Sequence, residues 1–339
     1  MGPLRSVKAR GLRRLGRLDV RLDGASLVLV GRSGCGKSTL LEAIALELDA
    51  EMDGRAHPAL DIEASGGAAQ ELRMAFVSRP VQLRWERDFV GEWQKGAAIA
   101  LHLDDVRTPA PRGPGPFETN AIAPRARVAP WLAATLAERS ARASASADAA
   151  DAGRHRAWIA SVEGALRDLL GEPKLAITFP DGALALDLGD GRRPRLDELP
   201  RAQRTALDLF AELSMRVEAA RRRAGRATLD PPGLALVDGI ERDLDARLSQ
   251  RLLPSLARHF PSVQWVVTTQ SPLTALSLEG ATVVDLGARE VRTTSTLRRE
   301  GLEALAARMT AEVAPAPKSL PPPPGRLPPN RLTEPDGSG

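Results

Sequence analysis

The stretch Gly31-Arg32-Ser33-Gly34-Cys35-Gly36-Lys37-Ser38-Thr39 fits the phosphate-binding loop pattern GxxxxGK[ST] at every fixed position. Glycines let the backbone wrap a phosphate group with its N–H groups pointing inward, and a helix that begins at the loop adds its positive dipole end. In such a loop Lys37 neutralises the β and γ phosphates, and the Ser38 hydroxyl binds a magnesium ion that bridges them. The nine residues therefore predict a binding site for a nucleoside triphosphate, ATP, with Mg²⁺.

The flanking sequence agrees with this prediction. Residues 27–30 form a short apolar run that is typical of a buried parallel strand, and residues 40–48 favour a helix. Strand, glycine loop and helix thus follow one another in the order that phosphate binding requires. The alternative is a glycine turn that only connects a strand to a helix. Cys35 is either a small residue that fits a crowded loop or a thiol whose reactivity the helix start enhances.

The composition restricts the class of protein. With 339 residues, 43% of them hydrophobic, the chain is long enough to bury a large α/β core. The sequence has no run of eighteen uncharged apolar residues and no signal-peptide core, so we expect a soluble, cytoplasmic protein without a membrane segment. Cys35 is the only cysteine, which excludes an internal disulfide, and the four histidines lack the spacing of metal ligands.

The pattern along the chain indicates four parts. Residues 1–106 form the first half of an ATPase domain, 107–172 a proline-rich connection and a helical insertion, 173–312 the second half, and 313–339 a disordered proline-rich tail. Within these parts we expect a strand at 72–77, a helix at 89–101, helices over 128–170 with a hairpin tip at 140–153, a β-hairpin around Pro180-Asp181-Gly182 and a helix at 198–223. The fold class is therefore α/β, with a largely parallel central sheet, an antiparallel β subdomain and a helical insertion.

A second motif supplies a carboxylate. Residues 233–237 read as a buried strand that ends at Asp238, and an acidic residue at such a strand end holds magnesium through water beside a phosphate loop. Asp238 is thus the expected partner of Ser38 at the metal. Glu241, three residues later, either acts as a base in the site or orders the start of the following helix.

The segment after this strand carries a family resemblance. It shows the ordered pieces Val237-Asp238, Ile240-Glu241, Leu244, Gln250-Arg251-Leu252-Leu253-Pro254, Phe260-Pro261, Val263-Gln264 and Thr268-Thr269-Gln270-Ser271-Pro272. This order resembles the carboxyl-terminal half of bacterial AAA-type ATPases of the ABC, RecF and SMC-like group, over roughly residues 4–286. The resemblance implies a P-loop NTPase fold of the ABC ATPase type, ATP-dependent dimerisation, and action on DNA or a partner protein.

The chain departs from that family at its catalytic positions. Gly239 stands where the family has a catalytic glutamate, and Gln270 stands where it has a histidine. Gln270 can orient a water or sense the γ-phosphate by hydrogen bonding, but it cannot shuttle a proton as histidine does. The family's signature sequence at a helix start is replaced by residues 199–204, in which Pro200 removes a donor and Arg201 is either a guanidinium for the phosphate or a solvent-facing side chain.

Three functions remain open from the sequence. The first is a slow ATPase with Lys37, Asp238, Gln270 and Glu241 in its catalytic machinery, and the second is a nucleotide-gated binding module that does not turn over. A small-molecule kinase is disfavoured by the 201-residue separation of Lys37 and Asp238 and by the late Thr-Thr-Gln-Ser-Pro sequence. The net charge of +4 is weak evidence for DNA. The arginine clusters at 10–17 and 221–226 could contact phosphates, but a solvated helix face or loop is favoured because no aromatic residues are interleaved with them.

Overall fold

The computed structural model describes residues 2–10, 17–52, 81–85, 89–103 and 128–310. Its centre is a six-stranded sheet with the order β11-β10-β3-β9-β8-β5. The strands are β11 (Glu290–Thr293), β10 (Thr282–Asp285), β3 (Leu27–Val30), β9 (Val263–Thr268), β8 (Gly233–Val237) and β5 (Ile99–Leu103). All neighbours pair in parallel except β10 and β11, so the largely parallel sheet of a P-loop NTPase fold is confirmed.

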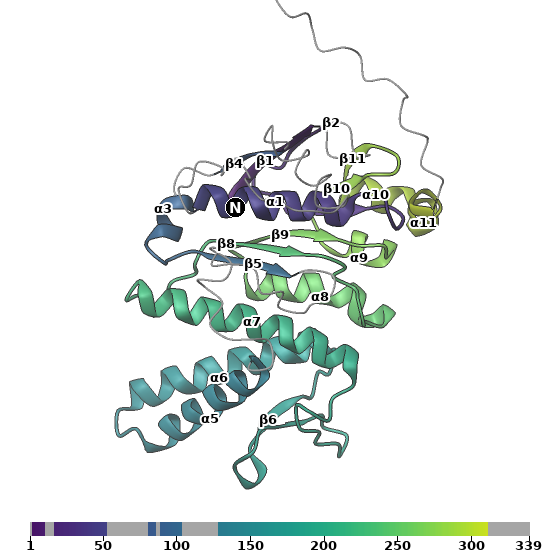
Figure 1. Ribbon diagram of the computed structural model, residues 1–339. Coiled ribbons are helices and arrows are strands. Elements are labelled where there is room, and N and C mark those ends of the chain that lie inside the picture. The colour runs from purple at the N-terminus through teal and green to yellow at the C-terminus, as the bar shows by residue number, and fades with distance from the viewer. Residues whose placement is uncertain (1, 11–16, 53–80, 86–88, 104–127, 311–339) are drawn as a thin grey trace, which may run out of the picture.

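Side chains of the sheet alternate between two apolar cores. Leu27 and Leu29 of β3 pack into one core with helix α1 (Lys37–Met52), whereas Val28 and Val30 pack into the other. The second core is closed by α7 (Arg201–Arg223) and α8 (Ala246–His259), which cover the opposite face of the sheet in Figure 1. This alternation follows from the two-residue period of a strand, and burial of both faces explains why the strands read as continuous apolar runs.

Two antiparallel elements complete the sheets. The strands β2 (Arg17–Arg21), β1 (Leu4–Arg10) and β4 (Val81–Trp85) form a small sheet beyond α1 (Figure 1). The buried Gln264 side chain ties this sheet to the central one, since its oxygen accepts from the Leu4 amide at 2.7 Å. The expected β-hairpin is present as β6 (Ala176–Thr178) and β7 (Ala185–Asp187), joined through a 3₁₀ turn at Pro180–Gly182.

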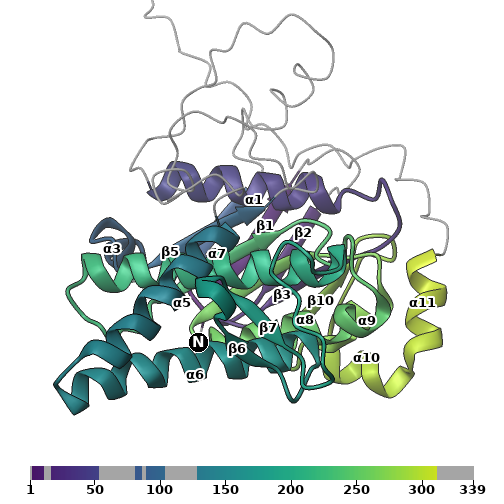
Figure 2. The ribbon, with the colours of Figure 1, turned by 90° about the horizontal axis from the view of Figure 1, so that it is seen from below.

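The helical insertion is an antiparallel hairpin of α5 (Val128–Ala145) and α6 (Ala149–Leu170). It lies against α7 and α8 on the side away from the sheet (Figures 1 and 2). The tip is shorter than the predicted 140–153, because Asp148 caps α6 by accepting from the Ala150 amide and allows the helix to start at residue 149.

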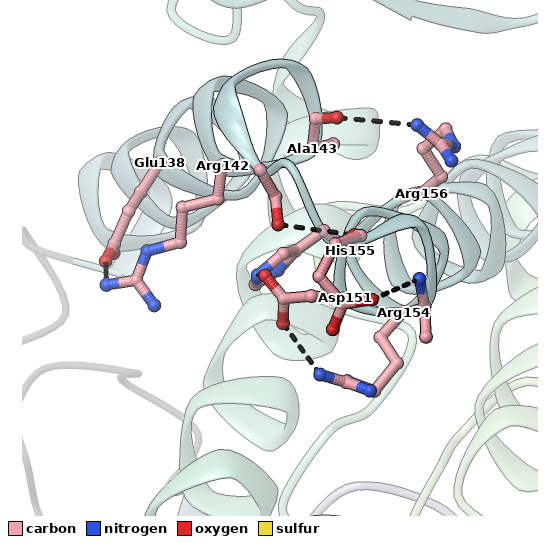
Figure 3. Close-up of polar contacts among 10 residues, drawn as sticks. Glu138, Arg142, Ala143, Asp151, Arg154, His155 and Arg156 are labelled. Carbon is pink, nitrogen blue, oxygen red and sulfur yellow. Dashed lines mark hydrogen bonds and ion pairs between the residues drawn. The ribbon is translucent and has the colours of Figure 1, made fainter.

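Charged groups at this tip are paired with one another, as Figure 3 shows. Arg142 contacts Glu138 at 2.5 Å, and Arg154 contacts Asp151 at 2.8 Å. Hydrogen bonds from Ser146 and Arg154 lower the pKa of the Asp151 carboxyl. These pairs lie within single helices at three- or four-residue spacing and are exposed, so each contributes little to stability.

Two sequence predictions need correction, and three others fall on residues outside the described ranges. The helix expected at 89–101 is wrong in its second half, since α3 (Phe89–Gln94) ends early and residues 99–103 form β5, which pairs with β8. Tertiary pairing overrides helix propensity there. The long helix α7 begins at 201 rather than 198. The strand predicted at 72–77, the proline-rich connection around 108–116 and the tail from 313 lie outside the described residues.

Three short helices follow the central strands: α9 (Pro272–Ser277), α10 (Thr294–Glu300) and α11 (Leu302–Thr310). The Ser271 hydroxyl caps α9 by accepting from the Thr274 amide, so the chain turns sharply at the end of β9. Among all the helices in the described ranges, none combines the length and apolarity needed to cross a membrane.

Candidate nucleotide site

The loop at residues 31–36 has the backbone that its glycines predict. Gly31, Gly34 and Gly36 have φ values of 130°, 77° and 102°, which side-chain-bearing residues rarely adopt. At Gly31 space is also limiting, because a Cβ atom there would lie 2.9 Å from the Cys35 sulfur. Helix α1 starts at Lys37, and its first turn closes through the bond from the Leu40 amide to the Gly36 carbonyl. The loop therefore leads directly into a helix N-terminus.

Lys37 is buried within this loop. Its ammonium donates to the carbonyl oxygens of Gly31 at 2.7 Å and Arg32 at 3.0 Å, and it lies 3.9 Å from the Cys35 sulfur. Cys35 is buried beneath the lysine, whereas residues 32–34 and Ser38 are exposed. The outer arc of the loop and the Ser38 hydroxyl are thus accessible to a ligand, and the lysine is held inside the curve that a phosphate group would enter.

Asp238 follows directly after β8 and is 6% exposed. Its Oδ1 accepts a hydrogen bond from the Thr268 hydroxyl at the end of β9, and the same hydroxyl oxygen accepts from the Gly239 amide at 2.7 Å. The amide of Asp238 donates to the Leu103 carbonyl at 2.9 Å. The carboxylate is therefore fixed between two strand ends, which is the environment expected for a group that orients water around a metal ion.

The sheet order brings these groups to one edge. Strand β9 lies between β3, which leads into the phosphate loop, and β8, which leads into Asp238. Because the three strands are parallel, their carboxyl ends meet at the same edge, and the Thr269 amide donates to the Leu29 carbonyl at 3.0 Å. The crevice outside such strand ends is where open α/β sheets bind ligands.

Glu241 and Gln270 are brought together, although they are far apart in sequence. The backbone N–H of Gln270 donates to Oε1 of the Glu241 side chain at 2.7 Å. The sequence left open whether Glu241 orders the start of the following helix. That role belongs to Asp245, whose side chain accepts from the Leu248 amide at 2.8 Å. Glu241 instead links the loop after β8 to the loop after β9.

Arg201 lies at the start of α7 and pairs within the chain. Its guanidinium contacts the Asp243 carboxylate at 3.0 Å, while the arginine side chain is 81% exposed. The preceding Pro200 provides no side-chain cap to the helix, as the sequence indicated. In the arginine cluster at 221–226, Arg221 also has partners, since it contacts Glu218 at 2.8 Å and donates to the Leu229 carbonyl.

The role of Thr268 is not evident from the sequence pattern. There the residue is only the first of Thr268-Thr269-Gln270-Ser271-Pro272, with no contact assigned to it. The signal that was available is its position as the last residue of a buried strand, where a hydroxyl needs a hydrogen-bonding partner. The neighbouring strand that provides Asp238 is set by the long-range pairing of β8 with β9.

No protein-family model matches the chain. Three solved structures that align with it are SMC head domains. A head bound to the C-winged helix domain of ScpA shares 13% identity at a TM-score of 0.43, over 87% of this chain and 99% of that chain. A head with an extended coiled coil, bound to the C-terminal domain of ScpA derived from Pyrococcus furiosus, shares 12% identity at a TM-score of 0.42. The alignment covers 90% of this chain and 100% of that chain. The head from Thermotoga maritima shares 12% identity at a TM-score of 0.41, over 84% of this chain and 95% of that chain. At these values the evidence for a P-loop NTPase fold is the chain's own strand order and loop geometry.

Proposed function

We propose that this chain binds ATP with Mg²⁺ at residues 31–39 and hydrolyses it slowly. The observation that carries the proposal is the placement of Lys37 and Asp238 at one edge of the sheet, on loops that follow the strands on either side of β9. A buried lysine inside a glycine loop and a buried carboxylate at the same edge of the sheet are the two charged groups that a metal–triphosphate complex requires.

Each residue of the site has a defined task in this proposal. The amides of the loop and the α1 N-terminus hold the phosphates, and Lys37 exchanges its carbonyl partners for phosphate oxygens. Ser38 and Asp238 are the residues that would hold Mg²⁺, which neutralises charge on the β and γ phosphates. Gln270, which is exposed at the same edge, orients water or senses the γ-phosphate.

Slow turnover follows from position 239. Gly239 has no side chain with which to polarise water, and a positioned general base is worth about 10²–10⁴-fold in rate. The same feature favours a second candidate, a module that binds ATP without hydrolysing it. In both cases we propose membership of the AAA-type ABC, RecF and SMC-like group, with nucleotide-dependent dimerisation and a DNA or protein partner.

The two candidates are separated by phosphate release. We expect the wild-type chain to bind a fluorescent ATP analogue and to release phosphate from ATP above the level of a Lys37→Ala variant. Light scattering on the same samples would detect an ATP-dependent increase in mass if nucleotide drives dimerisation. Binding that depends on Lys37 without phosphate release above the variant would exclude the ATPase and leave the non-hydrolysing module.

A further inference from the structure

Only one of the two Glu241 carboxylate oxygens is hydrogen-bonded. Oε1 accepts a hydrogen bond from the backbone N–H of Gln270 at 2.7 Å, whereas Oε2 is buried and has no hydrogen-bond partner within the described part of the chain. Buried side-chain oxygens without a partner are uncommon in folded proteins, because such an oxygen loses its hydration without gaining a hydrogen bond in return. An unpartnered carboxylate oxygen at this edge of the sheet therefore points to a ligand with an O–H or N–H group.

The position of Glu241 does not depend on that second oxygen. The Ile240 amide donates to the Thr268 carbonyl at 3.1 Å, and the Leu244 amide donates to the carbonyl of Glu241 at 3.0 Å. Together with the bond from Gln270, these contacts fix the residue on both sides. Oε2 thus belongs to a residue that joins the loops after β8 and β9, at the edge of the sheet where β3 leads into the phosphate loop, and it has no hydrogen-bond partner among the described residues.

We propose that Oε2 of Glu241 accepts the proton of the water that attacks the γ-phosphate, and so provides part of the base catalysis that Gly239 cannot provide. This inference rests on the proposed ATPase function. The water oxygen forms a bond to the γ-phosphorus, and the bond from that phosphorus to the β–γ bridging oxygen breaks with its electron pair going to ADP. The water proton passes to Oε2, and the carboxyl group afterwards returns it to solvent.

Glutamine at position 241 separates this role from a purely positional one. In Glu241→Gln the amide oxygen still accepts from Gln270, but the second oxygen becomes an NH₂ group that cannot take a proton. We expect phosphate release to fall about 10²-fold or more, with binding of the fluorescent ATP analogue changed by less than about threefold. Glu279→Gln, which alters an exposed carboxylate in the turn before β10, is the matched control and should retain the wild-type rate.

Glu241→Ala, which removes both carboxylate oxygens, gives an independent comparison. Wild-type turnover that Glu241→Gln leaves unchanged, with Glu241→Ala impaired, would overturn the proposal in favour of a positioning role while leaving the ATPase intact. If the wild-type chain binds ATP but releases no phosphate, both this proposal and the ATPase are overturned.

Discussion

The hydroxyl of Thr268 donates to Oδ1 of Asp238 and at the same time accepts from the Gly239 amide at 2.7 Å. One side chain at the end of β9 therefore fixes both the Asp238 carboxylate and the backbone of Gly239. Asp238 and Thr268 are buried, so neither bond competes with bulk water. The contact spans 30 residues of sequence and exists because β8 and β9 are neighbours in the sheet.

Replacing Thr268 tests this relationship. Thr268→Val keeps the shape of the side chain but removes the hydroxyl, so Asp238 loses a donor that orients it. We expect the affinity for Mg²⁺-ATP to fall about 10–100-fold, the range typical when a partner of a metal-binding group is lost. Thr268→Ser retains the hydroxyl and should bind like wild type. Equal affinity of the valine and serine variants in calorimetric titration would show that the bond does not position Asp238.

A buried ion pair inside α7 predicts an asymmetric effect on stability. Arg216 contacts Glu212 at 2.7 Å and donates to the Ala100 carbonyl of β5 at 2.7 Å, and both charged side chains are less than 10% exposed. Arg216→Met leaves Glu212 buried without its partner, so we expect the free energy of unfolding to decrease by about 3–5 kcal/mol. Adding Glu212→Leu removes the unpaired buried carboxylate, so the double variant should recover most of the lost free energy of unfolding.

Urea unfolding measures both variants, and an exposed pair provides the control. Arg142 pairs with Glu138 at the hairpin tip with both side chains more than half exposed, so Arg142→Met should cost no more than about 1 kcal/mol. A double variant of α7 as unstable as Arg216→Met alone would mean that packing against β5, rather than the unpaired charge, determines the loss.

His259 predicts a pH-dependent stability. Burial lowers the pKa of His259, a neighbouring Asp168 opposes this shift, and Arg258 adds to it. The unfolded chain takes up a proton near pH 6.5, the ordinary pKa of histidine, whereas the folded chain does so only at lower pH. Stability therefore decreases as the pH falls below about 6.5 and levels off below the folded-state pKa. His259→Gln should lack this part of the decrease, and urea midpoints that fall identically in both proteins would contradict it.

The sequence predicted the features that depend on local spacing. The glycines at 31, 34 and 36 fix the loop conformation within a few residues, and the apolar runs at 27–30 and 233–237 identify buried strands. The sequence could not give the placement of β9 between β3 and β8, because strand order is decided by packing of the whole sheet. The contact of Glu241 with Gln270 depends on that order, and so do the partners of Asp238.

The failed helix at 99–101 has the same cause. Residues 97–101 contain three alanines, which favour a helix locally, yet Ile99 and Leu101 pack into the core beneath the sheet once this segment pairs with β8. The gain from burying these side chains and forming a strand ladder exceeds the small local preference. Elements whose state is set by a distant partner are the ones for which sequence patterns are least informative.

The central claim is that Lys37 holds a triphosphate at this loop, and calorimetric titration with ATP in the presence of Mg²⁺ tests it most directly. A hydrogen-bonded charge contributes about 1.5–3 kcal/mol, so Lys37→Ala should weaken binding about 10–100-fold. Lys95→Ala removes an exposed lysine that pairs with Glu92 and should bind as wild type does. Wild-type protein that binds no ATP, or that binds it as tightly after Lys37→Ala, would contradict the nucleotide site.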